Sequence, residues 1–153
     1  MLFRSDWVNP DPDEVIKETN SFETMGIWDH IEKLKHSKSK LPNGASMIIE
    51  PTSAFVAVDV NTGNDFSLSA GLKANLAVAK ELPNQLSLRG LGGQIIIDFA
   101  PSPKKDRKLI ETALNSSFRK GKIDTVVVGW TTLGNFELQR KRERIPLSEL
   151  LQD

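Results

Sequence analysis

Short apolar runs separated by breaker residues mark the middle of the chain. Residues 45–50 and 54–61 are largely apolar, and the breakers at 51–53 separate them. Runs of this length are typical of strands, and their close spacing predicts a hairpin-like pair. Residues 94–99 and 125–130 predict a third and a fourth strand. The third is nearly all apolar, as expected of a strand buried on both faces.

Apolar residues at helical spacing fill the gaps between these strands. The segment 72–86 is amphipathic, and Pro83 within it predicts a kink or a break. A second amphipathic pattern covers 109–118. A shorter helix is predicted over 26–36, and the tail 133–144 is read as a further helix.

This alternation of strands and helices predicts an α/β fold. We expect one domain, a mixed sheet of about four or more strands packed with two main amphipathic helices. The domain is predicted over 41–147, after an N-terminal extension at 1–40 that is partly irregular with one helix. Residues 148–153 form a tail. No apolar run reaches the length of a membrane span, which predicts a cytoplasmic protein without a membrane partner.

Composition narrows the chemistry that the chain can perform. The 153 residues include no cysteine and only two histidines, which excludes disulfides and thiolate metal sites and disfavours zinc. Residues 1–32 carry eight acids against two bases, whereas residues 100–144 carry eleven bases against five acids. The basic part either binds an anionic partner or is one of two solvated surfaces that neutralise each other.

Two acids stand out because each one ends an apolar strand. Asp59 and Asp98 fall where the ligand crevice of α/β sheets lies, at the carboxyl ends of strands. Asn61 projects from the same face as Asp59 because side chains alternate along a strand. Carboxylate and amide oxygens suit Mg²⁺. The alternative is that all three residues merely cap the loops that follow the strands.

Five motifs in register resemble the ribonuclease E/G family. They read AVDVNTG at 57–63, NL at 75–76, LSLRGLGG at 86–93, IIDF at 96–99 and LGNFELQRKR at 133–142. The resemblance covers about residues 40–147, and the part matched is the family's deoxyribonuclease I-like subdomain.

The resemblance implies an endoribonuclease, a metal-dependent hydrolase of RNA processing. Asp59 and Asp98 would hold Mg²⁺ with support from Asn61, and single-stranded RNA would be cut to 5′-phosphate and 3′-hydroxyl ends. The closing motif would bind the RNA backbone through Arg140, Lys141 and Arg142. An exposed helix face with ion pairs is the structural alternative for these bases.

The chain also departs from the family pattern. The S1-type RNA-binding and 5′-sensing domains of full-length members do not fit within residues 1–40. Pro101 stands where members often have a further Asp, and Asn84 and Ser87 stand where arginines are frequent. These departures favour the alternative of a non-catalytic RNA-binding or assembly module, whereas the presence of Asp59, Asn61 and Asp98 opposes it. The zinc-link cysteines that help members of the family to dimerise are absent. A homo-oligomer is still one of the partners that the resemblance implies.

Overall fold

The computed structural model describes residues 11–152, which divide into two compact units that part after Lys33. The first unit contains the short helix α1 (Ser21–Thr24) and most of α2 (Ile27–Leu34), and neither helix has a buried residue. Helix α2 confirms the helix predicted over 26–36. The expected irregular extension includes residues 1–10, which lie outside the described residues.

The second unit contains one mixed sheet, in the strand order β1-β2-β3-β4-β6-β5. The strands are β1 (Lys38–Lys40), β2 (Ser46–Pro51), β3 (Val56–Asn61), β4 (Gly93–Asp98), β5 (Thr125–Trp130) and β6 (Phe136–Arg140). Strands β2 and β3 form the predicted antiparallel hairpin, β3 and β4 are parallel, and β6 runs antiparallel to both β4 and β5. The predicted α/β class, with a mixed sheet and two main helices, is confirmed.

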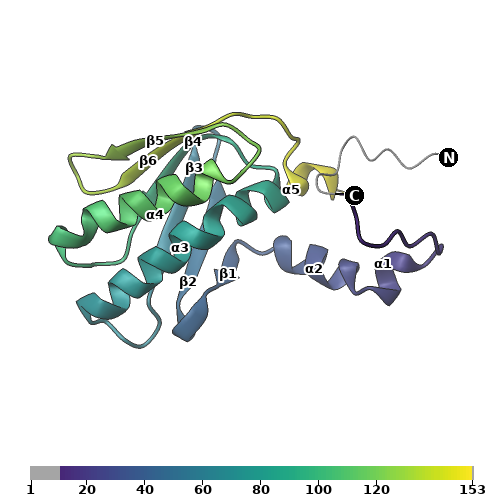
Figure 1. The fold of residues 1–153 in the computed structure, drawn as a ribbon, viewed down its shortest axis with the longest axis horizontal. Helices are drawn as coiled ribbons and strands as arrows, with labels where there is room; N and C mark the ends of the chain where they lie inside the picture. Colours follow the sequence, from purple (N-terminus) through teal and green to yellow (C-terminus); the bar gives the residue numbers. More distant parts are fainter. Residues whose placement is uncertain (1–10, 153) are drawn as a thin grey trace. The chain divides into compact units, whose positions relative to one another are not determined.

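Helices α3 (Leu68–Arg89) and α4 (Arg107–Arg119) lie side by side over one face of the sheet (Figure 1). Alternate strand residues point at them and are buried, such as Val58 of β3 and Ile97 of β4. The residues between them are exposed or half-buried, so the opposite face of the sheet is open. The prediction that 94–99 is buried on both faces is therefore wrong, because helices cover one face alone.

The predicted break at Pro83 and the predicted helix in the tail are wrong. Pro83 does not break α3, which continues to Arg89 and is capped by Gly90 in the left-handed conformation. Leu82 and Leu86 on either side of Pro83 are fully buried, and this packing outweighs the one backbone hydrogen bond that proline removes. The tail 133–144 is not helical: β6 occupies 136–140, and a short helix α5 (Leu147–Leu150) follows later.

Two 3₁₀ turns, η2 (Pro42–Gly44) and η3 (Lys104–Asp106), complete the described structure. Within residues 11–152, no helix combines the length and the apolar character needed to cross a bilayer.

Candidate active site

The two strand-end acids lie opposite each other in the sheet. Asp59 and Asp98 are register partners on the parallel strands β3 and β4, whose backbones run about 4.8 Å apart in a sheet. Each follows a buried residue, Val58 and Ile97, so both side chains project from the open face. Both are solvent-exposed. Two residues that are 39 positions apart in the chain thus present carboxylates from neighbouring points of one surface.

Asn61 joins this pair from the same strand as Asp59. Its Nδ2 donates a hydrogen bond to Oδ2 of Asp59 at 3.1 Å. This bond leaves Oδ1 of Asp59 available, and within the described part of the chain Asp98 makes no side-chain hydrogen bond or ion pair. The structure therefore brings together the three residues singled out in the sequence, with most of their oxygens free for a ligand.

The carboxylate and amide oxygens of Asp59, Asp98 and Asn61 fit a hard divalent cation that keeps part of its water shell. In residues 11–152 there is no cluster of three or more acidic, histidine or cysteine side chains placed to enclose a metal. Mg²⁺ does not need such an enclosure, because it is commonly held by one or two carboxylates together with waters and substrate phosphate. Asp59 and Asp98 supply two carboxylates on an open surface, which leaves room for those waters and for a phosphate.

The side chain of Asn75 fixes the segment after Asp98, a role that the sequence did not predict. Asn75 of α3 is fully buried, and its Oδ1 accepts a hydrogen bond from Ala100 N at 2.9 Å. Its Nδ2 donates to Ala100 O at 2.9 Å and to Ser102 Oγ at 3.3 Å. The signal available in the sequence was a polar residue on the apolar side of an amphipathic helix, where an amide must find partners.

The bases of the closing motif lie at the other end of the sheet. Arg140 is the register partner of Gly93, which begins β4, whereas Asp98 ends that strand. Five residues of extended strand separate the two positions, a distance of roughly 16 Å. The structure does not bring Arg140, Lys141 and Arg142 next to the carboxylates.

Arg140 is buried inside the fold and is not available on the surface. It is 3% exposed, and its two terminal nitrogens donate to Thr125 Oγ1 at 3.0 Å and Ser87 Oγ at 2.9 Å. Its guanidinium also lies over the ring of Phe118, 5.8 Å from the centroid. Burial lowers the pKa of Arg140, and the nearby Arg144 adds to that effect.

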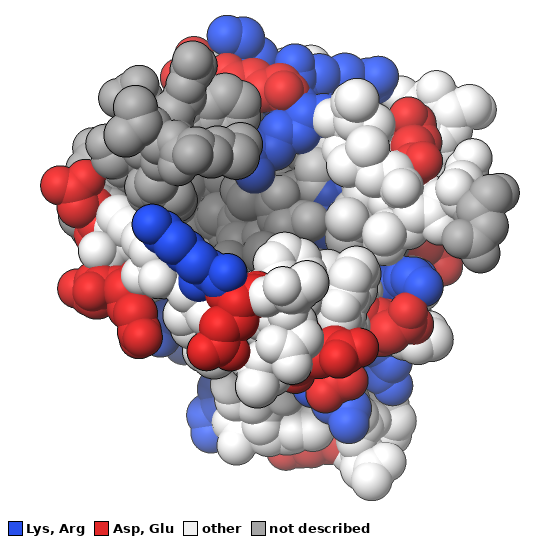
Figure 2. Space-filling view, turned by 90° about the vertical axis from the view of Figure 1, so that its right-hand side faces the viewer, with Lys and Arg blue, Asp and Glu red and all other residues white. Residues whose placement is uncertain are grey.

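Lys141 and Arg142 are exposed, so they are the members of this motif that a ligand can reach. Lys141 Nζ lies 3.2 Å from Glu143 Oε1 in an ion pair on the surface. On the face drawn in Figure 2, acidic and basic side chains of the described residues lie close to one another over much of the surface.

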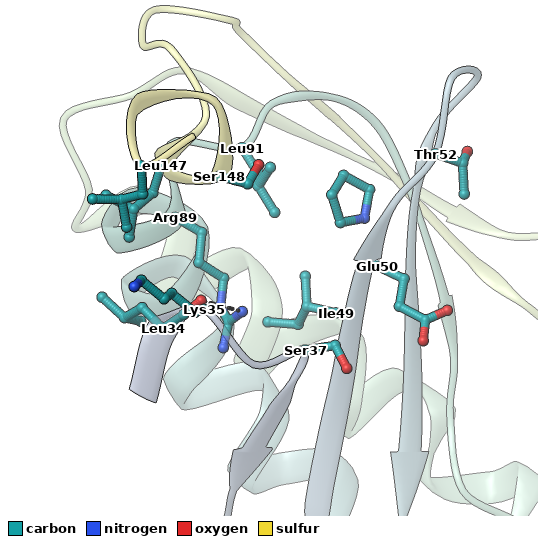
Figure 3. A pocket seen from close by; sticks show the side chains of 12 residues that line it. Leu34, Lys35, Ser37, Ile49, Glu50, Thr52, Arg89, Leu91, Leu147 and Ser148 are labelled. Carbon is teal, nitrogen blue, oxygen red and sulfur yellow. Dashed lines mark hydrogen bonds between the residues drawn. The ribbon is translucent and has the colours of Figure 1, made fainter. Parts of the chain in front are cut away.

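A hollow of about 560 Å³ is shown in Figure 3, and neither Asp59 nor Asp98 is among the residues that line it. Its wall includes Ile49 and Pro51 of β2, Leu147 of α5 and the buried Arg89. Arg89 donates to the carbonyl oxygens of Leu34 at 3.2 Å and His36 at 2.8 Å, and to Gln85 Oε1 at 3.2 Å. These bonds anchor the segment before β1, which gives this arginine a role in the fold.

Comparison with known proteins shows that this chain is similar to bacterial ribonucleases. The model of the Ribonuclease E/G family matches residues 6–143. Ribonuclease G of Escherichia coli (strain K12) is 32% identical over 139 residues, covering 85% of this chain and 28% of that protein. Ribonuclease E of Synechocystis sp. is 40% identical over 116 residues, covering 72% of this chain and 17% of that protein.

Ribonuclease E of Escherichia coli (strain K12) is 31% identical over 134 residues, which are 84% of this chain and 12% of that protein. The chain therefore spans between about a tenth and about three tenths of the length of these relatives. The family match covers both strands with the paired acids, the helix between them and the basic motif of β6. The chain belongs to the ribonuclease E/G family.

Proposed function

We propose that this chain is a Mg²⁺-dependent endoribonuclease domain that cuts single-stranded RNA in the cytoplasm. The products would carry 5′-phosphate and 3′-hydroxyl ends, and Asp59, Asn61 and Asp98 would form the catalytic site. The observation that carries the proposal is the register pairing of Asp59 with Asp98 on the open face, with Asn61 bonded to Asp59. Family membership supports the same reaction class.

Each residue has a distinct task in this proposal. Asp59 and Asp98 would hold the cation through carboxylate oxygens that are free in the structure. The chemistry supplied by such a bound ion is a more acidic water and positive charge against the scissile phosphate. Asn61 keeps one oxygen of Asp59 engaged through its Nδ2, which fixes how that carboxylate is turned. The amide oxygen of Asn61 then remains available to accept a hydrogen bond from the attacking water.

The open face explains how a polymer could reach this site. Asp59 and Asp98 project from the side of the sheet that α3 and α4 do not cover, so an RNA strand can cross the edge without entering a closed cavity. Exposed acids alone would repel RNA, so binding depends on the cation and on bases elsewhere. We propose that Lys141 and Arg142 contact the backbone of a longer RNA, and that the buried Arg140 holds the end of β6 that precedes them.

The relatives are several times longer than this chain, so RNA binding by the isolated 153 residues is itself part of the proposal. The competing function is an RNA-binding or assembly module that keeps the fold without cutting. Phosphate-dominated binding by such a module would weaken steeply with salt whether or not Mg²⁺ is present.

Single-turnover cleavage of a short, unstructured, end-labelled RNA tests the proposal. Cleavage should require Mg²⁺, and Asp59→Asn or Asp98→Asn should abolish it. The matched control is Asp124→Asn, since Asp124 is an exposed acid near the opposite end of the sheet. Unchanged rates in both active-site variants would show that the site is wrongly assigned. RNA binding without cleavage in the unmodified chain would favour the binding module.

A further inference from the structure

Helix α3 contacts the segment that follows Asp98 at two positions one helical turn apart. Gly71 and Asn75 are four residues apart, so they lie on the same face of the helix. Both are buried, and both touch the chain between Ala100 and Ser102. The spacing is thus matched to one short stretch of backbone.

Asn75 binds this stretch as a second strand would. Its amide accepts from Ala100 N–H and donates to Ala100 O, so one side chain satisfies both backbone groups of a buried residue. Pro101 and Pro103 follow at once, and neither has an N–H to donate. The turn after β4 is therefore held largely from outside, by the side chain of a neighbouring helix.

Gly71 sets how closely the helix approaches the same turn. A Cβ added to Gly71 would overlap the carbonyl oxygen of Pro101, so no other residue fits unless the two backbones separate. A close approach of this kind is a position that requires glycine. Gly71 and Asn75 together hold the turn at a fixed distance from α3.

The same helix is tied to the other carboxylate through the chain. Asp59 and Asn61 belong to β3, and a short loop leads from Asn61 into α3, whose first turn is capped by Ser67 accepting from Ala70 N at 3.2 Å. Asp98 lies two residues before the clamped Ala100. Helix α3 therefore connects both acids, by covalent continuity to one and by the Asn75 clamp to the other.

We infer that Asn75 is a positioning residue that holds the Asp98 carboxylate in register with Asp59 and thereby sets the affinity of the pair for a divalent cation. The inference rests on the proposed function. It concerns a residue that touches neither the cation nor RNA and acts through the backbone of Ala100. Loss of the clamp frees the turn beside Asp98, so the two carboxylates no longer share one fixed separation.

Mn²⁺ binding to the full chain, measured by calorimetry without RNA, tests this inference. Replacing groups that orient metal ligands typically weakens metal binding by about 10- to 100-fold. We expect Asn75→Ala to weaken Mn²⁺ binding about tenfold. Leu82→Ala is the matched control, because Leu82 is equally buried on the same helix and far from the clamp. It should lower the thermal midpoint while leaving Mn²⁺ affinity unchanged. Faster hydrogen exchange at the Ala100 amide in Asn75→Ala alone would report the freed turn.

A second variant covers the case in which Asn75→Ala fails to fold. Gly71→Ala keeps the Asn75 side chain but pushes the turn away from α3, and it should also weaken Mn²⁺ binding. Wild-type affinity in the folded clamp variants, with weakened binding in Asp98→Asn, would overturn the inference and leave the proposed metal site intact. Wild-type affinity in Asp98→Asn would instead remove the proposed site, and the inference with it.

Discussion

The two ends of the central sheet treat their charged side chains in opposite ways. At the end where β3 and β4 finish, Asp59 and Asp98 are exposed and adjacent, and no base is bonded to them in the described structure. At the end where β4 begins, Arg89 and Arg140 are at least 92% buried and bonded to neutral oxygens. Two acids are exposed at one end, and two arginines are buried at the other.

The buried arginines contribute to the stability of the fold, whereas the exposed pair of acids does not. A buried guanidinium is retained when the oxygens around it replace its water, and its removal then leaves those oxygens without a partner. Two like charges on neighbouring strands gain nothing for the fold and repel each other. The contacts of the acidic pair give it no role in the fold, which is consistent with the proposed metal site, whereas the two arginines hydrogen-bond the oxygens around them.

The largest loss of stability should follow from replacing Arg89. Arg89→Met keeps much of the side-chain length but removes donors to two backbone carbonyls and one amide oxygen. We expect a decrease of about 3 kcal/mol in the free energy of unfolding. Urea denaturation measures it. A change below about 0.5 kcal/mol, as for an ordinary surface position, would remove the contrast between the two ends.

Arg140→Met should give the next largest loss, about 2 kcal/mol, because it removes donors to Thr125 and Ser87. Arg140→Lys should recover little, since an ammonium cannot reproduce the planar fork of the guanidinium. Urea denaturation of the two variants, beside Ser87→Ala, checks the result. Stability retained in Arg140→Met together with lost RNA affinity would return Arg140 to the RNA-binding surface.

Most of the strands and helices could be predicted from the sequence, and two strands could not. The four strong strands and both main helices follow from the spacing of apolar residues and from breaker residues. The proximity of Asp59, Asn61 and Asp98 follows from their place at strand ends. Strand β6 was not predicted, although the buried Phe136, Leu138 and Arg140 alternate with more polar residues. Arg140 belongs to a run of charged residues, so nothing in the sequence indicated that its side chain is buried. Strand β1 has no apolar residue and joins the sheet at its edge through pairing with β2.

A pattern in one segment also cannot reveal a partner in another. The clamp between Asn75 and Ala100 joins residues 25 positions apart, and the bond of Arg89 to His36 joins residues 53 positions apart. Such contacts depend on the packing of α3 against the sheet, which the linear sequence does not display. The proximity of Asp59 and Asp98 was easier to predict, because the carboxyl ends of neighbouring strands meet at one side of an α/β sheet.

The exposed bases should matter little for stability and more for RNA. Lys141→Ala combined with Arg142→Ala should change the free energy of unfolding by less than about 0.5 kcal/mol, because surface ion pairs contribute little. If each base neutralises one phosphate of single-stranded RNA, the slope of log affinity against log salt becomes shallower by about 1.4. Fluorescence anisotropy at several salt concentrations measures the slope. An unchanged slope would place the RNA path elsewhere.

The smallest expected effect concerns Asp65, in the loop between Asn61 and α3. The Ser67 N–H donates to its Oδ1 at 2.9 Å, and this bond holds the pKa of Asp65 below its ordinary value. A lowered pKa stabilises the fold at pH values above the unfolded pKa, and that stabilisation is lost as pH falls through the folded value. Asp65→Asn should therefore lower the thermal midpoint slightly at pH 6 and not at pH 2. An equal shift at both values would contradict the assigned cause.

The most direct test of the contrast is the thermal midpoint of unfolding with and without Mg²⁺, in the unmodified chain and in Asp59→Asn combined with Asp98→Asn. Without Mg²⁺ the double variant should be at least as stable, because it lacks the repulsion between two carboxylates. Added Mg²⁺ should raise the midpoint of the unmodified chain progressively and leave the double variant unmoved, since only a ligand that binds the folded state shifts it. A lower midpoint of the double variant without Mg²⁺, or an equal response of both proteins to Mg²⁺, would contradict the account.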